Sequence, residues 1–165
     1  MRPPAIPLEK ITALPLVYRA AVPEEYRDMM GHMNIRWYML LYDEAGIPLF
    51  EQLGLSLDYY RQNHAGGFDL EHHIHYLAEV NIGDTVAIYG RLLGRSAKRV
   101  HYMLFMVNET RGLLSSTFEC VNSHADLALR RTSPFPEHIA ARIDDVLAAH
   151  RQLDWDAPVC GAMGA

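Results

Sequence analysis

Apolar residues along the chain follow two contrasting patterns, and the first is helical. From Asn34 to Leu53 they cover nearly the whole circumference of a helix, and Gly54 is a stop signal directly after the last of them. A helix that is apolar all round predicts burial on all sides. Pro48 lies inside this stretch and predicts that the helix is kinked or divided there.

The second pattern begins at Phe68, where the periodicity changes to two, as is typical of strands. Residues 68–80 alternate between an apolar and a polar face, and strand-like runs follow at 85–93, 99–107 and 113–127. Short turns separate these runs, which implies antiparallel pairing between consecutive strands.

The remaining segments complete an α+β arrangement. In chain order they are an extended lead-in at 1–13, a strand at 14–22, a loop at 23–33, a short helix at 56–63, a helix at 139–150 and a poorly ordered tail at 151–165. We expect a single domain over residues 1–150, in which a five-stranded antiparallel sheet wraps one long central helix and a C-terminal helix follows.

Composition limits the classes of partner. The chain has 165 residues and a net charge of −5, whereas a general nucleic-acid binder needs a basic excess. Nothing resembles a membrane span of about 20 apolar residues, and the N-terminus does not resemble a signal peptide. Only two cysteines occur, which favours a reducing cytoplasm over a disulfide framework. We expect a cytoplasmic protein with a small-molecule ligand, without nucleic acid or membrane as partner.

Two motifs flank the long helix. Asp-Met-Met-Gly-His-Met-Asn occupies 28–34, and Ile-x-Tyr-Leu-x-Glu-Val-x-x-Gly-Asp occupies 74–84. In this order and spacing they resemble the 4-hydroxybenzoyl-CoA thioesterase group of hotdog-fold acyl-CoA thioesterases, and 126–136 resembles that group's exit from its last strand. The resemblance covers about residues 15–136. It implies the hotdog fold, hydrolysis of an acyl-CoA thioester to free acid and CoA, and a homodimer or homotetramer with sites at subunit boundaries.

The same resemblance implies that Asp28 attacks the thioester or activates a water. A helix N-terminus offers unpaired amides and about half a positive charge, so the amides of residues 34–36, with Ile35 between them, are expected to hold the oxyanion. His32 would hydrogen-bond the carbonyl, orient Asp28 or assist proton transfer. Gly31 would let the backbone approach the substrate closely.

Each of these residues also has a structural interpretation. Asp28 could be a turn residue and His32 a structural loop histidine, and Asn34 is a good helix N-cap. The related acyl-carrier-protein thioesterases carry Asn where this chain has Met30, which weakens an Asn-assisted mechanism. They also carry a carboxylate that matches Glu79, which makes Glu79 a second candidate base, with a strand-end charge as the alternative.

Aromatic and basic side chains are candidates for substrate binding. The aromatic set, for which core packing is the alternative, is Trp37, Tyr38, Tyr42, Tyr59 and Tyr60. Such rings could line an acyl pocket and could hold a quaternary-ammonium acyl group such as betainyl. The basic set, which could hold the CoA phosphates or be solvated surface charge, is Arg95, Lys98 and Arg99.

Charged and histidine side chains suggest little further chemistry. Asp43 and Glu44 lie on the helix predicted to be buried, so we expect them to be paired, as structural or interface charges. His72, His73 and His75 lack a further ligand pair at zinc spacing, so neither a metal nor a cofactor beyond the CoA of the substrate is expected.

Two other functions remain open. One is a hotdog-fold hydratase or dehydratase acting on acyl thioesters, although its usual signature around Asp and His is missing. The other is a non-catalytic acyl-CoA-binding sensor, which would bind the ligand without turnover.

Overall fold

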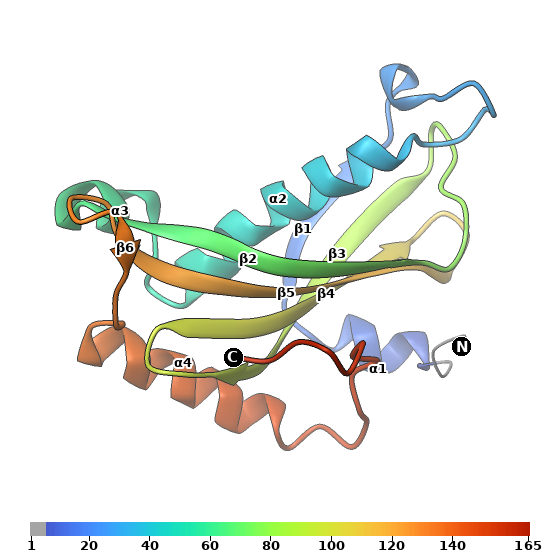
Figure 1. Ribbon diagram of the computed structural model, residues 1–165. Coiled ribbons are helices and arrows are strands. Elements are labelled where there is room, and N and C mark those ends of the chain that lie inside the picture. The colour runs from blue at the N-terminus through green and yellow to red at the C-terminus, as the bar shows by residue number, and fades with distance from the viewer. Residues whose placement is uncertain (1–5) are drawn as a thin grey trace. The chain divides into compact units, whose positions relative to one another are not determined.

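The computed structural model describes residues 6–165 of the chain (Figure 1). Its elements in chain order are α1 (Leu8–Thr12), β1 (Leu16–Ala21), the 3-10 helix η1 (Glu24–Tyr26), α2 (Ile35–Gln52), α3 (Leu57–Asn63), β2 (Ala65–Tyr76), β3 (Thr85–Arg95), β4 (Arg99–Asn108), β5 (Leu113–Asp126), β6 (Arg131–Thr132) and α4 (Glu137–His150). The predicted α+β succession is confirmed.

The strands form one sheet in the order β1-β3-β4-β5-β2. β1 pairs antiparallel with β3, with an irregularity between Leu16 and Tyr18. The five predicted strands are confirmed, and the two-residue β6, which pairs with β5 off this path, is too short for its alternation to show in the sequence. β1 and β2 end the order, so among residues 6–165 each has one side without a partner strand in this sheet.

The chain forms two compact units, to both of which α2 and strands β2 to β5 contribute. The first unit comprises the described residues up to Pro48 together with 74–90 and 104–118. The second comprises 49–73, 91–103 and 119–165. The expectation of a single domain over residues 1–150 stays a prediction.

In the first unit, α2 packs one face against the sheet. Tyr38, Leu41, Tyr42 and Ala45 follow helical spacing and are buried. The Tyr42 ring stacks on Phe118 of β5 at 4.9 Å between centroids, and its hydroxyl lies 2.6 Å from Ser116 Oγ. The long helix is therefore anchored to β5 by both an apolar and a polar contact.

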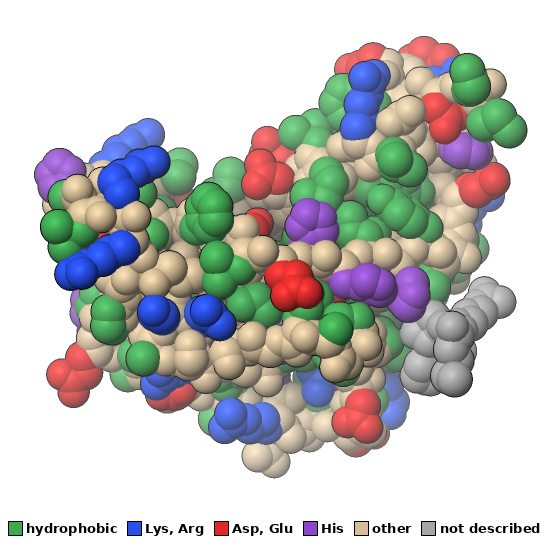
Figure 2. Space-filling view, viewed as in Figure 1, with side chains coloured by type: hydrophobic (Ala, Val, Ile, Leu, Met, Phe, Trp, Pro, Cys, Tyr) green, Lys and Arg blue, Asp and Glu red, His purple; other side chains and the backbone are tan. Residues whose placement is uncertain are grey.

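The opposite face of α2 is exposed, so the predicted burial on all sides is wrong for the chain by itself. Ile35, Leu40 and Ile47 are 66%, 37% and 42% exposed, and hydrophobic side chains are visible on the face shown in Figure 2. Asp43 and Glu44 are exposed as well. The desolvation that led us to expect them to be paired is therefore absent in the single chain.

Both ends of α2 follow the sequence signals. The helix continues through Pro48, so it is not divided there, and the alternative of a kink stays a prediction. It ends at Gln52, and Gly54 follows with φ +87°, a conformation that favours glycine. A Cβ at Gly54 would also lie 2.8 Å from Ile139 Cδ1, so a larger residue would require the Ile139 side chain to shift.

The two ends of the described chain differ from the prediction in detail. Residues 8–12 are helical where an extended lead-in was predicted, because Ile11 is fully buried and anchors a turn too short to show a period. Residues 1–5 of that lead-in lie outside the described residues. The predicted C-terminal helix is confirmed as α4, which buries Ile139, Ile143 and Leu147.

Residues 151–165, predicted as a poorly ordered tail, make specific contacts inside the second unit. The Trp155 carbonyl accepts a hydrogen bond from Arg91 Nη1 at 2.9 Å, and the Arg91 guanidinium lies 4.3 Å from the Trp155 ring centroid. The Cys160 amide donates to the buried Glu119 carboxylate at 2.7 Å.

Within residues 6–165, no helix has the length and apolarity needed to cross a membrane.

Candidate functional site

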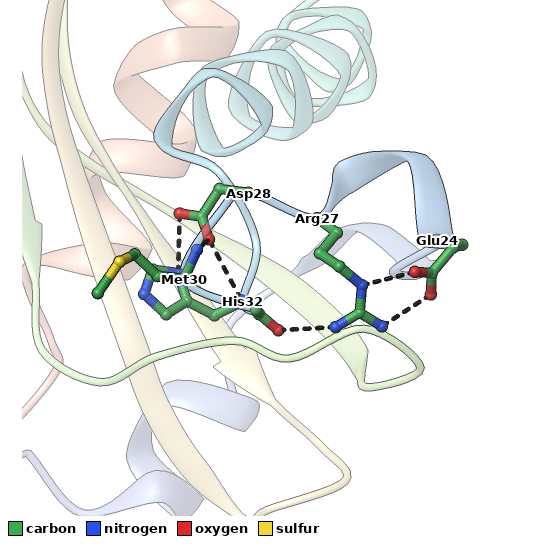
Figure 3. Close-up of polar contacts among 6 residues, drawn as sticks. Glu24, Arg27, Asp28, Met30 and His32 are labelled. Carbon is green, nitrogen blue, oxygen red and sulfur yellow. Dashed lines mark hydrogen bonds and ion pairs between the residues drawn. The ribbon is translucent and has the colours of Figure 1, made fainter.

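The loop between η1 and α2 is fixed by a clamp at its base. The Arg27 guanidinium donates two hydrogen bonds to the Glu24 carboxylate, at 2.5 and 2.8 Å, and a third to the Gly31 carbonyl at 3.1 Å (Figure 3). Gly31 has φ +94°, which explains why glycine stands here. The Met33 amide donates to the Val80 carbonyl at 2.8 Å, which ties the loop to the segment after β2.

Asp28 is held at the centre of this loop with its carboxylate toward His32. Its Oδ1 accepts from the Met30 amide at 2.8 Å and from the His32 amide at 3.4 Å, and Oδ2 lies 3.2 Å from His32 Nδ1 (Figure 3). The side chain of Asp28 is only 15% exposed. Asp28 therefore has two roles. It is a turn residue that accepts backbone amides, as the structural alternative in the sequence analysis had it, and its carboxylate also contacts the His32 ring.

A pocket of about 320 Å³ lies beside this pair in the first unit. Its lining comes from the loop, the start of α2, the end of β2 and the segment that follows β2. It consists of His32, Met33, Ile35, Tyr38, Tyr76, Leu77, Ala78 and Glu79. The volume falls in the range of small-ligand sites. Four residues predicted for the site from the sequence are brought together here, namely His32, Ile35, Tyr38 and Glu79.

Glu79 approaches His32 from the side opposite to Asp28. His32 Nε2 lies 3.9 Å from Glu79 Oε1, while Nδ1 faces Asp28. The Glu79 side chain is 69% exposed. The His32 imidazole therefore lies between two carboxylates. Asp28 is close and largely buried, whereas Glu79 is exposed and too distant for a hydrogen bond.

The start of α2 leaves one backbone donor without an acceptor at a residue that lines the pocket. Asn34 caps the helix, because its Oδ1 accepts from the Arg36 amide at 3.1 Å and its carbonyl accepts from the Trp37 amide at 3.0 Å. Within residues 6–165, no acceptor is recorded for the Ile35 amide. Since Ile35 also lines the pocket, this N–H can serve a ligand oxygen with the help of the helix dipole.

Several predicted substrate-binding aromatics pack elsewhere. The Trp37 ring stacks on Tyr26 at 4.0 Å, with the Arg36 guanidinium 4.8 Å from its centroid, and it does not line the pocket. Tyr42 is a core residue. Tyr59 lies in the second unit, where its hydroxyl is 3.0 Å from His124 Nε2.

The predicted CoA-binding basic residues also lie in the second unit, and one of them is already paired. Arg95 donates to both carboxylate oxygens of Asp144 on α4, at 2.6 and 2.5 Å, which raises the pKa of Arg95 and lowers that of Asp144. Arg99 Nε is buried without a hydrogen-bond partner in the described part of the chain. Phosphate binding by Arg95, Lys98 and Arg99 stays a prediction.

Sequence reasoning missed the contribution of β2 to the pocket. Tyr76 meets Tyr38 edge to face, with ring centroids 5.0 Å apart and planes at 87°. Burial raises the pKa of Tyr38 to about 12 and also raises that of Tyr76, so both rings are neutral at ordinary pH. The available signal was that Tyr76 opens the same Tyr-Leu-Ala-Glu run that ends at Glu79.

The histidines of β2 form no metal centre in the described residues. No group of three His, Cys, Asp or Glu side chains in residues 6–165 is placed to hold a metal ion. His72 and His73 are exposed and His75 is half-buried.

Residues 22–143 match the thioesterase-like superfamily. The chain belongs to this family. The predicted enzyme class, a thioester hydrolase, is thereby confirmed, and the loop, the pocket and the helix start described above all lie within the matched range or border it.

Named relatives and solved structures agree with this assignment. Betainyl-CoA thioesterase of Pseudomonas aeruginosa is 30% identical over 138 residues, which cover 82% of this chain and 86% of that protein. L-carnitine dehydrogenase/betainyl-CoA thioesterase of Rhizobium meliloti is 25% identical over 127 residues, and the match spans 77% of this chain and only 25% of that protein.

A Staphylococcus aureus protein solved in complex with CoA has the same fold. Its TM-score is 0.81 at 24% identity, over 92% of this chain and 96% of that one. Together with the observed strand order, this likeness confirms the predicted hotdog fold.

Proposed function

We propose that the protein hydrolyses an acyl-CoA thioester in the pocket beside Asp28 and His32. The observation that carries this proposal is that one cavity is lined both by His32, whose ring Asp28 orients, and by Ile35, whose amide has no acceptor within residues 6–165. A hydrolase acting on a carbonyl needs a base and an oxyanion donor at one reacting carbon. This pocket offers both.

The geometry favours His32 as the group that activates water. Asp28 holds the Nδ1 side of the ring, so Nε2 is directed away from it, toward the side where Glu79 lies. Nε2 takes a proton from water as the water oxygen forms a bond to the thioester carbon. The carbonyl electron pair moves to oxygen, which the Ile35 amide stabilises.

Collapse of this tetrahedral intermediate completes the reaction. The carbonyl re-forms, the C–S bond breaks, and the electron pair leaves on the sulfur of CoA. The proton on His32 Nε2 passes to that thiolate, so the products are the free acid and CoA, and the imidazole returns to its starting form. Asp28 stabilises the transient imidazolium by its negative charge.

Direct attack by Asp28 is the second route implied by the family resemblance. It is less well supported, because Oδ1 accepts two backbone amides and Oδ2 faces His32, and the side chain is only 15% exposed. A nucleophile must be free to approach the carbonyl carbon. We therefore assign Asp28 the orienting and charge-stabilising role.

The acyl group that we propose is small and carries a quaternary ammonium, as in betainyl-CoA. Support comes from the Pseudomonas aeruginosa relative, whose name states this substrate and which is 30% identical over 138 residues. Support also comes from the pocket, whose 320 Å³ suits a short acyl group rather than a long chain.

We also propose that the protein forms a homodimer through the edge of β2. β2 is an edge strand of 12 residues, and it exposes Phe68 and Leu70 by 64% and 42%. A long apolar edge without a partner strand invites pairing with a second copy.

The test is a thiol-release assay over a panel of acyl-CoAs with the wild type and His32→Gln. We expect turnover of betainyl-CoA by the wild type and a loss of about 100-fold or more in kcat for His32→Gln, because general-base catalysis is worth about 10² to 10⁴ in rate. Asp58→Asn, at an exposed carboxylate of the second unit, is the matched control. Unchanged kcat in His32→Gln would refute the assigned base.

The same assay separates the rival functions. A hydratase would consume the double bond of an enoyl-CoA without releasing thiol. A binding protein would retain acyl-CoA without any turnover.

A further inference from the structure

We propose that Glu79 is a specificity residue that recognises the positive charge of the acyl group, with the half-exposed ring of Tyr76, packed against the buried Tyr38, forming the rest of the recognition surface. This inference deepens the proposed function and rests on hydrolysis taking place in the same pocket. It gives Glu79 a role different from both sequence-based interpretations, which were a second candidate base and a strand-end charge.

The charges around the pocket favour a cation. Its lining residues include neither lysine nor arginine, and Glu79 is the only acidic residue among them. Both tyrosines are neutral, since burial raises their pKa values. A cationic group entering this pocket therefore meets an attractive carboxylate, whereas an anionic group would be repelled and an uncharged one would gain nothing from it.

Glu79 is free to meet such a ligand. Its side chain is 69% exposed, and the recorded contact within the described chain is the 3.9 Å approach of its Oε1 to His32 Nε2. That distance is too long for a hydrogen bond. A carboxylate in this position is not committed to a structural ion pair, and it is also not placed to share a proton with His32 directly.

The ring of Tyr76 adds a surface that suits a quaternary ammonium in particular. Cations are attracted to the face of an aromatic ring, and methylated ammonium groups, which cannot donate hydrogen bonds, depend on this attraction. The edge-to-face packing of Tyr38 and Tyr76, at 5.0 Å and 87°, holds the rings in fixed orientations. Tyr76 is half exposed, so part of its ring is available to a ligand in the pocket.

The position of Glu79 relative to the catalytic group also fits a short acyl chain. In a betainyl group, one methylene separates the carbonyl carbon from the ammonium nitrogen. A carbonyl carbon near His32 Nε2 would therefore leave the ammonium nitrogen a few ångströms from that carbon. The Glu79 carboxylate lies at a similar distance from Nε2, 3.9 Å. A longer acyl chain would carry its charge past this carboxylate.

The experiment compares two substrates that differ in charge and hardly in shape. Betainyl-CoA is assayed beside 3,3-dimethylbutyryl-CoA, in which carbon replaces the ammonium nitrogen. For each enzyme, kcat/KM is measured on both, and the ratio of the two values is the readout. Because exposed cation–π contacts and ion pairs are each worth little, we expect Glu79→Gln to lower the ratio about three- to tenfold.

A second pair of variants tests the rings. Tyr76→Leu should lower the same ratio, whereas Tyr76→Phe, which keeps the aromatic face, should leave the ratio near that of the wild type. Circular dichroism and a melting curve for each variant show that it is folded before its ratio is compared.

The outcomes separate this inference from the function beneath it. If Glu79→Gln lowers kcat/KM equally for both substrates, Glu79 acts in the chemistry, and the charge-recognition role is refuted while hydrolysis stands. The same role is refuted if the ratio does not change. If the wild type releases thiol from neither substrate at any measurable rate, the proposed function and this inference fall together.

Discussion

Replacing Asp28 by Asn tests how much the carboxylate contributes through its charge. Asparagine has nearly the same shape and can still accept the Met30 amide through its oxygen, as Asp28 Oδ1 does at 2.8 Å. What it removes is the negative charge beside the ring of His32. The loop should keep its conformation while the imidazolium formed during the reaction loses its counter-charge.

The size of the effect follows from the geometry. Two unit charges 3.2 Å apart, the distance from Asp28 Oδ2 to His32 Nδ1, attract by about 5 kcal/mol at an effective dielectric constant of about 20. The two side chains are 15% and 29% exposed, so solvent screening reduces this value. We take about 3 kcal/mol, which corresponds to about 150-fold in rate.

The assay is steady-state thiol release from betainyl-CoA at saturating substrate. We expect kcat of Asp28→Asn to fall about 150-fold with KM changed little, since the charge acts only once the imidazolium forms. A melting temperature close to that of the wild type shows that the loop remains folded. A kcat within threefold of the wild type would show that Asp28 is a turn residue and no more.

Three further predictions concern stability and assembly. Tyr42→Phe should destabilise the fold by about 1–3 kcal/mol because Ser116 loses its buried partner, and the double variant with Ser116→Ala should recover part of the loss in urea unfolding. Burial and the Arg91 charge lower the pKa of His150, and its Nδ1 accepts a hydrogen bond from the Leu92 amide, as a neutral ring does. Below pH 6.5 the unfolded chain therefore binds more protons than the folded one, and stability should fall as pH falls from 6.5. The variant His150→Asn should flatten this pH dependence in melting curves. Phe68→Lys on the β2 edge should shift the protein from dimer to monomer in sedimentation, and an unchanged mass would exclude this edge as the interface.

Periodicity predicted the order of the elements because it reports the residue types that each element must bury. The period of two after Phe68 gave the long strands, and Gly54 gave the end of α2 through its left-handed backbone. Periodicity does not report how much of the rest of the protein is available to cover each apolar face of a helix. In a single chain the sheet covers only one face of α2, so Ile35 and Leu40 stay exposed despite being apolar.

The sequence predicted the part of the site that lies in one continuous segment, but not the part formed by packing between distant segments. A motif identifies residues that are adjacent in sequence, so Asp28 and His32 were found together, and the helix cap at Asn34 followed from its position. The pocket also depends on the packing of β2 against the start of α2. Tyr76 was therefore recognisable as a strand residue but not as a partner of Tyr38.

The most direct test of the account is a single turnover of betainyl-CoA by excess enzyme in water enriched in oxygen-18. Attack by a water that His32 activates predicts one heavy oxygen in the released acid and none in the peptide that contains Asp28. Heavy oxygen in the carboxylate of Asp28, with unlabelled acid, would show that the aspartate attacks the thioester itself and would contradict the roles assigned to both residues.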